Sequence, residues 1–210
     1  MAYRVKTPWI LSKVLYSRLT WKMPATQEPC VYLTFDDGPH PTATPFVLEL
    51  LKQYNAKATF FCIGKNVAEH RDIYNDIQAQ GHTTGNHTQD HLNGWHTTKE
   101  KYINNVREAE QYISSRIFRP PYGRIRRGQV NALTHSAQPY HIYMWDVLSG
   151  DFDTNITPEE CLYNVITNIE PGSIVVFHDS RKAWQRMSYT LPKVLEHCTA
   201  NNWQLKALPQ

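Results

Sequence analysis

The sequence predicts a single α/β domain with a parallel sheet, in a barrel-like or doubly wound arrangement. Strand-like and helix-like segments alternate from residue 31 to the end of the 210-residue chain, as they do in βαβ units. Several strand segments are apolar at consecutive positions, which suits strands covered on both faces. The length corresponds to one domain, and no internal repeat or linker divides the chain.

Seven segments have the composition of strands, and six segments between them have that of helices. The predicted strands are 31–36, 57–62, 82–86, 116–119, 140–145, 173–178 and 203–207. The predicted helices are 44–55, 65–80, 98–115, 125–137, 158–169 and 182–201. Two helix starts have the spacing of a capping box, at Thr97–Glu100 and at Thr157–Glu160, and Pro158 adds a proline at the first helical position.

Residues 1–29 are predicted to form an N-terminal extension, helical in part, ahead of a domain spanning 30–210. In a helix, Ile10, Leu11, Val14, Leu15 and Leu19 would share one face. Such a helix could pack under the domain or lie at a membrane surface as a peripheral contact.

The N-terminal segment does not have the pattern of a membrane anchor or a secretory signal. No apolar stretch reaches the roughly 18 residues that span a bilayer, and no small-residue cleavage site follows the basic N-terminus. We therefore expect a cytoplasmic protein, with membrane association through the N-terminal helix as the alternative.

Composition argues against several other classes of protein. The net charge is only +3, and the basic cluster of Arg124, Arg126 and Arg127 is short, so a solvated helix face is favoured and no nucleic-acid partner is expected. The four cysteines match no zinc pattern, and Cys62 lies in an apolar run that predicts a buried thiol. No Gly-rich loop followed by Lys-Ser/Thr is present, which argues against a nucleotide-binding domain.

Clusters of polar residues follow the predicted strands where each strand ends. In parallel α/β folds the carboxyl ends of the strands meet at one edge, where active sites form. The clusters are Asp36-Asp37, His87 to His91, Arg119 to Tyr122, Asp146 to Asp153 and His178-Asp179.

These clusters contain the residue types of a metal-dependent hydrolytic site. Asp36 and Asp37 are adjacent carboxylates that repel each other, so one would bind a cation and the other act as a base; the competing interpretation is a simple turn. In a helical turn His87 and His91 would face one metal ion, and a carboxylate would complete a set that keeps positions open. Near such a set, His178 is favoured as a general acid over a structural histidine.

In combination and order, the motifs resemble those of the polysaccharide deacetylases. These form carbohydrate esterase family 4, built on the nodulation-protein-B homology domain, and the resemblance covers about residues 30–207. The first motif, TFDDGP at 34–39, and the second, HTQDH at 87–91, are full matches, and the third reads RPPYG at 119–123. The fourth keeps Asp151 but has Phe152 where the family has Trp. The fifth keeps His178 and has Val176 where the family has Leu.

The resemblance implies a distorted (β/α)7 TIM-like barrel that is a metal-dependent hydrolase. Its catalytic domain, 30–210, would remove N-acetyl groups from N-acetylglucosamine-type sugars of an oligo- or polysaccharide, releasing acetate and a free amine. The family pattern makes Asp36 the base, His178 the acid supported by Asp151, and Arg119 the residue that orients the base. Asp37, His87 and His91 would bind one divalent ion, for which Zn is favoured although Co, Ni, Mn or Fe fit the same ligands.

A sugar pocket is expected beside these groups. The Tyr122 N–H is implied to hold the oxyanion, and the implied or candidate substrate-binding residues are Pro120, Tyr122, Trp145, Phe152 and Val176. Two alternatives stay open: an O-acetyl carbohydrate esterase using the same site, and a non-catalytic carbohydrate-binding relative. The intact set of base, acid and ligands argues against the second alternative, since binding alone needs no base or acid.

Overall fold

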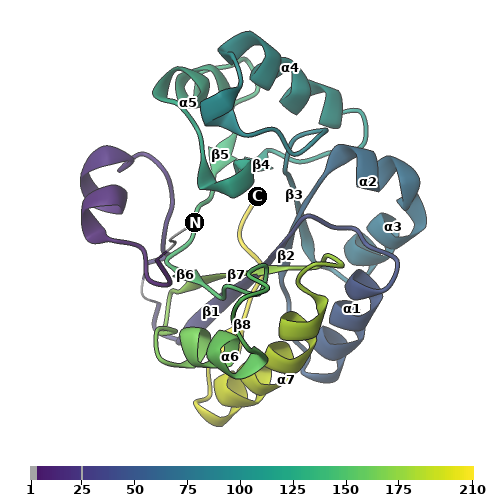
Figure 1. Cartoon of the computed structure of the whole chain (residues 1–210), viewed down its shortest axis with the longest axis vertical. Helices are drawn as coiled ribbons and strands as arrows, with labels where there is room; N and C mark the ends of the chain where they lie inside the picture. Colours follow the sequence, from purple (N-terminus) through teal and green to yellow (C-terminus); the bar gives the residue numbers. More distant parts are fainter. Residues whose placement is uncertain (1–3, 25) are drawn as a thin grey trace.

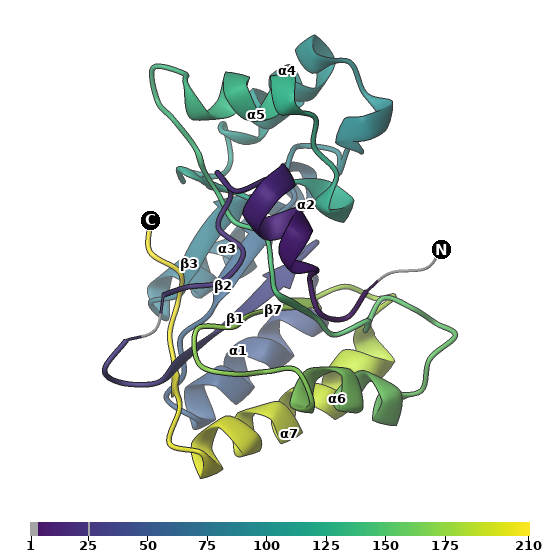
Figure 2. The same ribbon diagram turned by 90° about the vertical axis from the view of Figure 1, so that its left-hand side faces the viewer.

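The sheet is built outward from β1 (Cys30–Asp36), all of whose residues are buried. The computed structural model describes residues 4–24 and 26–210, and Figures 1 and 2 show helices arranged around this sheet. The strand order is β5-β4-β3-β2-β1-β7-β6, every pairing along it is parallel, and β8 pairs with β1 at its start. The remaining strands are β2 (Thr59–Cys62), β3 (Thr83–Asn86), β4 (Ile117–Phe118), β5 (His141–Ile142), β6 (Val147–Leu148), β7 (Ile174–His178) and β8 (Gln204–Leu205).

Helices connect successive strands except β5 and β6, and they join the strands that pair in parallel. They are α1 (Ala43–Gln53), α2 (Gly64–Glu69), α3 (Arg71–Ala79), α4 (Lys99–Ala109), α5 (Arg127–Thr134), α6 (Pro158–Ile166) and α7 (Trp184–Ala200), with short turns η1 (Leu11–Leu15), η2 (Gly94–His96) and η3 (Pro121–Gly123). In Figure 1, α4 and α5 cover one end of the sheet, and α6 and α7 lie at the other. The arrangement is a curled, open barrel, so the predicted α/β fold with a TIM-like sheet is confirmed.

The predicted elements differ from the observed ones at three places. The segment 140–145 is a strand only at β5, and the chain then bends into β6, a two-residue strand that the sequence did not predict. The predicted helix 65–80 is divided at His70, whose ψ of 55° is not helical. The cap of α4 is Thr98, which accepts a hydrogen bond from the Lys101 N–H, and not Thr97. The capping box at Thr157 forms as predicted.

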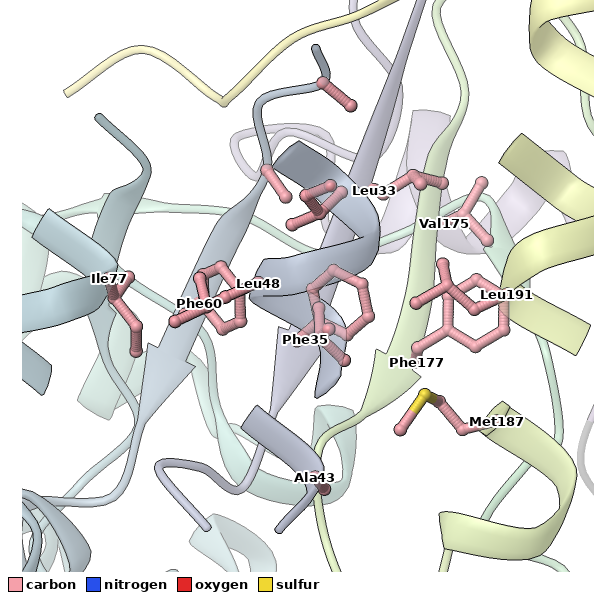
Figure 3. Close-up of a cluster of buried hydrophobic side chains, with 14 of the residues drawn as sticks. Leu33, Phe35, Ala43, Leu48, Phe60, Ile77, Val175, Phe177, Met187 and Leu191 are labelled. Carbon is pink, nitrogen blue, oxygen red and sulfur yellow. The ribbon is translucent and has the colours of Figure 1, made fainter. Parts of the chain in front are cut away.

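A stack of three phenylalanines forms the centre of the main core. Phe35 of β1 lies between Phe60 of β2 and Phe177 of β7, with ring centroids 5.1 and 6.0 Å apart. Figure 3 shows these rings with Leu48 of α1 and Leu191 of α7 packed against them. Because consecutive strands present large apolar side chains to the covering helices, the strands are held rigidly where they end at the site.

The N-terminal segment pairs with both edges of the open sheet. Lys6 bridges to Val147 of β6, and Thr20 bridges to Tyr143 just after β5. The backbone N–H of Leu148 donates to the Val5 carbonyl at 2.8 Å. Since these contacts satisfy backbone groups that an edge strand would leave open, the segment fills the gap between β5 and β6.

The helix expected in this segment is shorter than predicted. Its π-helical part is η1, and the apolar residues do not share a buried face: Ile10 and Val14 are exposed, whereas Leu19 is buried. The prediction of a common face is therefore wrong for Ile10, Val14 and Leu19. The side chain of Leu15, like residues 1–3 and 25, lies outside the described part. Within the described ranges, no helix is long and apolar enough to cross a membrane.

Candidate active site

The strand register brings the predicted base and acid to neighbouring positions. Asp36, the last residue of β1, pairs with His178, the last residue of β7. On the other side of β1, Asn86 ends β3 in register with Phe118 of β4, so His87 and Arg119 leave the sheet at the same edge. The prediction that polar clusters gather at one edge therefore describes the site, with one correction: Asp146 precedes β6 and lies at its opposite end.

Asp36 is held by a buried ion pair. Its Oδ1 lies 2.7 Å from Nη1 of Arg119, and the two residues are 3% and 0% exposed. The same Nη1 donates to Thr34 Oγ1 at 2.7 Å, and Nη2 donates to the Met144 carbonyl at 2.8 Å. Burial lowers the pKa of Arg119 while Asp36 raises it, and a guanidinium stays charged in proteins. The pair thus fixes the position of the Asp36 carboxylate against the positive charge of Arg119.

Aromatic rings enclose the Arg119 guanidinium. Its central carbon lies 4.1 Å from the centroid of Phe61 and 5.8 Å from that of Trp145. Phe61 occupies this place because Gly85 has no side chain: a Cβ there would lie 2.5 Å from the Phe61 ring. These contacts prevent Arg119 from reaching water, so its charge acts on Asp36 with little screening.

Asp37, His87 and His91 form a group with the geometry of a metal site. One ligand atom from each lies within 4.8 Å of the others. Asp37 Oδ1 is 3.1 Å from His91 Nε2 and 3.7 Å from His87 Nε2. Each Nδ1 has another partner: the Arg119 carbonyl at 2.8 Å for His87 and the Tyr122 hydroxyl at 3.1 Å for His91. Such outer partners orient imidazoles toward a metal, so the residues fit a divalent ion.

Burial and charge prepare these groups for ligation. Burial lowers the pKa of His87 to about 4, so its imidazole is neutral, as a ligand must be. Burial by itself would raise the pKa of Asp37, but the hydrogen bond with His91 and the positive charge of His178 hold that pKa well below its usual range. Asp37 is therefore ionised at any pH at which the protein would act.

The histidine pair is not helical, which corrects the sequence argument. Thr88 and His91 have φ of 67° and 57°, in the left-handed region. The Asn86 carboxamide, fully buried, supports this turn by accepting from the Thr88 N–H at 2.8 Å and donating to the Val106 carbonyl at 3.0 Å. The two imidazoles converge because of this turn and not through helical spacing.

His178, which is partly buried, and Asp151, which is buried, form a second pair. The Asp151 carboxylate accepts from the backbone N–H of His178 and lies beside its Nδ1, both at 2.7 Å. Burial by itself lowers the pKa of His178, but the Asp151 charge and hydrogen bond, with Asp37 and Asp36, raise it to about 10. His178 is therefore protonated near neutral pH, with Nδ1 engaged and Nε2 left to face a substrate.

The predicted sugar-pocket residues occupy different positions. Tyr122 is 60% exposed and its ring lies 4.5 Å from that of His91. Trp145 is partly buried under the η3 turn, and Phe152 packs edge-on against His178 at 5.2 Å. Pro120 is buried and Val176 is 1% exposed, so these two residues present little surface to a ligand.

Two residues support the site without a role predicted for them: Arg186 was not singled out in the sequence, and Asp179 was named only as part of a polar cluster. Arg186 of α7, 4% exposed, donates from Nε to the Asp151 carbonyl at 2.7 Å. Asp179 is fully buried beside Gly38, where a Cβ would overlap its carboxylate, and its Oδ2 accepts from Thr44 at 2.5 Å. Asp179 follows His178 directly, which was a signal, whereas nothing local to Arg186 indicates its partner.

Comparison with known proteins decides the family. The profile described as polysaccharide deacetylase matches residues 24–138. The chain belongs to the polysaccharide deacetylase family. It is 32% identical over 182 residues to a peptidoglycan-N-acetylglucosamine deacetylase of Bacillus cereus, covering 84% of each sequence. It is also 34% identical over 157 residues to a chitooligosaccharide deacetylase of Azorhizobium caulinodans, covering 71% of this chain and 73% of the relative.

A solved structure of a peptidoglycan deacetylase has the same fold over nearly the whole of this chain. The crystal structure of the Bc1960 peptidoglycan N-acetylglucosamine deacetylase, in complex with a 4-naphthalen-1-yl-N-oxidanyl-benzamide, superposes with a TM-score of 0.86 at 30% identity and 96% coverage of both chains. The predicted family and the predicted class, a carbohydrate deacetylase and thus a hydrolase, are confirmed.

Proposed function

We propose that this polysaccharide deacetylase removes N-acetyl groups from N-acetylglucosamine residues of a glycan and needs one divalent ion to do so. The observation that carries the proposal is the register of β1 and β7, which sets Asp36 and His178 side by side next to the Asp37, His87 and His91 group. A base, an acid and a ligand set at one strand edge are what amide hydrolysis needs. The relatives named above act on substrates of this kind.

Asp37, His87 and His91 would hold the ion, and this ligand set favours Zn. When bound, a divalent ion would lower the pKa of a water molecule and polarise the substrate carbonyl. The side chain of Asp36, held in place by Arg119 at 2.7 Å, would accept the proton of the attacking water. The backbone N–H of Tyr122 would donate to the oxyanion of the tetrahedral intermediate.

Release of the sugar amine requires a proton donor, because an amide nitrogen leaves poorly until it is protonated. His178 supports this role, since Asp151 keeps it protonated and occupies its Nδ1. The proton would pass from Nε2 to the departing nitrogen, and Asp151 would hold the ring in place during the transfer. The products would be acetate and the free amine.

The decisive experiment measures acetate release from N-acetylglucosamine oligomers and from an activated aryl acetate. Asp36→Asn should abolish both activities, because both need the proton acceptor. His178→Ala should reduce turnover of the oligomers by about 10²–10⁴-fold and spare much of the aryl acetate hydrolysis, since an aryl oxide leaves without protonation. O-acetylated glycans are assayed beside them. Acetate release from the O-acetylated glycans but not from the N-acetylglucosamine oligomers would favour the esterase alternative. No acetate release from either kind of glycan would favour a binding protein.

A peripheral contact with membranes is a separate part of the proposal. Trp9, Ile10 and Val14 are 67%, 51% and 59% exposed beside Lys13, which is the composition of an interfacial segment. Sedimentation with anionic vesicles tests it: the wild type should bind and Trp9→Ser/Val14→Ser should not. Absence of wild-type binding would contradict the contact without affecting the catalytic proposal.

A further inference from the structure

Trp95 is a large exposed aromatic side chain that no step described above uses. It is 49% exposed and lies in η2, four residues after the ligand His91. No role was predicted for it, because it belongs to none of the family motifs. Large aromatics usually bury most of their surface, so a half-exposed tryptophan close to a catalytic site requires an explanation.

The backbone around Trp95 is fixed by buried polar contacts. Gln129 of α5, fully buried, donates from Nε2 to the carbonyls of Gly94 at 3.0 Å and Thr97 at 3.2 Å. The Gly94 N–H donates to the Arg124 carbonyl at 3.2 Å, and a Cβ on Gly94 would overlap that oxygen. The turn is therefore locked to the chain that follows η3, while the Trp95 side chain remains outside. A rigid backbone that presents an exposed ring is suited to binding with little loss of entropy.

The turn that carries Trp95 is hydrogen-bonded to the chain two residues after Tyr122. The Tyr122 ring lies 4.5 Å from that of His91. Two residues later, the Arg124 guanidinium carbon lies 5.1 Å from the centroid of Trp95. Arg124 thus lies over the indole, and Trp95 is still 49% exposed. Tyr122, whose ring lies against that of His91, and Trp95 are thus carried by two turns that are bonded together.

We propose that Trp95, backed by Arg124, is a glycan subsite that stacks on a pyranose ring beyond the sugar being deacetylated. This inference rests on the proposed function. The occupant is the next part of the same glycan, because the Trp95 turn is bonded to the chain just after Tyr122, which lies at the site. The indole offers a flat apolar surface to the C–H face of a sugar, while the sugar hydroxyls stay in water. A substrate limited to one small ring would not reach it.

The test compares kcat/KM for an N-acetylglucosamine pentamer with kcat/KM for an activated aryl acetate. Trp95→Ala should lower the pentamer-to-aryl-acetate ratio at least tenfold, and Trp95→Leu should do the same because it keeps apolar bulk without a flat ring. Trp95→Phe should recover most of the ratio. Tyr163→Ala is the matched control, since Tyr163 is an exposed aromatic (69%) on α6, and it should leave the ratio unchanged.

Binding supplies an independent readout. In the Asp36→Asn background, Trp95→Ala should raise the Kd of the pentamer about tenfold by calorimetry. An unchanged ratio and Kd, or equal losses on both substrates, would overturn the subsite. Failure of the proposed function looks different, since the wild type would then release no acetate from the pentamer at all.

Discussion

Removing the charge of Asp151 should move the alkaline limit of activity to lower pH. Asp151 lies 2.7 Å from His178 Nδ1, and two unit charges at that distance attract by about 6 kcal/mol at an effective dielectric of about 20. This energy corresponds to about four pKa units at 1.36 kcal/mol each, which is an upper limit. A close opposite charge typically shifts a pKa by about 1–3 units, and the prediction uses that range. The raised pKa of about 10 for His178 contains this contribution.

The sign follows from the role of His178 as a proton donor. The histidine must be protonated to act, and its raised pKa preserves that form as pH rises. In Asp151→Asn the pKa falls, so kcat/KM on the N-acetylglucosamine oligomer should decline at a pH about 1–3 units lower than in the wild type. The negative charge of Asp37 also raises the pKa of His178, and a bound divalent ion would neutralise that charge. Both proteins should therefore be compared at saturating metal.

The assay is acetate release across pH 6–11, with Asp146→Asn as the matched control. Asp146 is also a buried carboxylate after β5 that accepts from a backbone N–H of β7, that of Ile174 at 2.7 Å, but it lies at the far end of the strand. Its substitution should leave the alkaline limit in place. If Asp151→Asn keeps the wild-type alkaline limit while oligomer turnover remains measurable, the reasoning about His178 is refuted.

Four further substitutions test the other groups of the site. His87→Ala and His91→Ala should each lose the divalent ion in metal analysis, and about one ion per chain in both variants would contradict the ligand assignment. Arg119→Met should lower the free energy of unfolding in urea by about 3–5 kcal/mol, because a buried Asp36 is left unpaired; the cost should shrink in the Asp36→Asn background, and equal costs would argue against the pair. Burial raises the pKa of Asp179 to about 8, so stability should fall by up to about 1.4 kcal/mol per unit as pH rises from about 4 to about 8. Asp179→Asn should remove this fall in chemical denaturation of the metal-free protein, and an unchanged slope would show that Asp179 is not its source.

Local patterns in the sequence were sufficient for the fold class and for the residue types of the site. Strand segments are short apolar runs, and each run ends where a polar cluster begins, so Asp36, His87 and His178 could be assigned to one sheet edge before any contact was known. The apolar pattern was weakest for β6, because two residues carry no periodicity. The same short strand explains why Asp146 is not part of the site. Asp146 precedes β6 and Asp151 follows it, so the two residues lie at opposite ends of that strand.

Only the tertiary structure decided which groups meet and in what state. Arg119 reaches Asp36 across 83 positions of the chain, and Arg186 reaches the Asp151 carbonyl across 35; no local pattern encodes such pairs, since they depend on strand register and on which side chains exclude water. The pKa of His178 follows from this packing. So does the closure of the sheet edges by the N-terminal segment, where the sequence predicted a longer helix. Residue types and strand ends are local properties of a chain, whereas burial and long-range pairing exist only once it has folded.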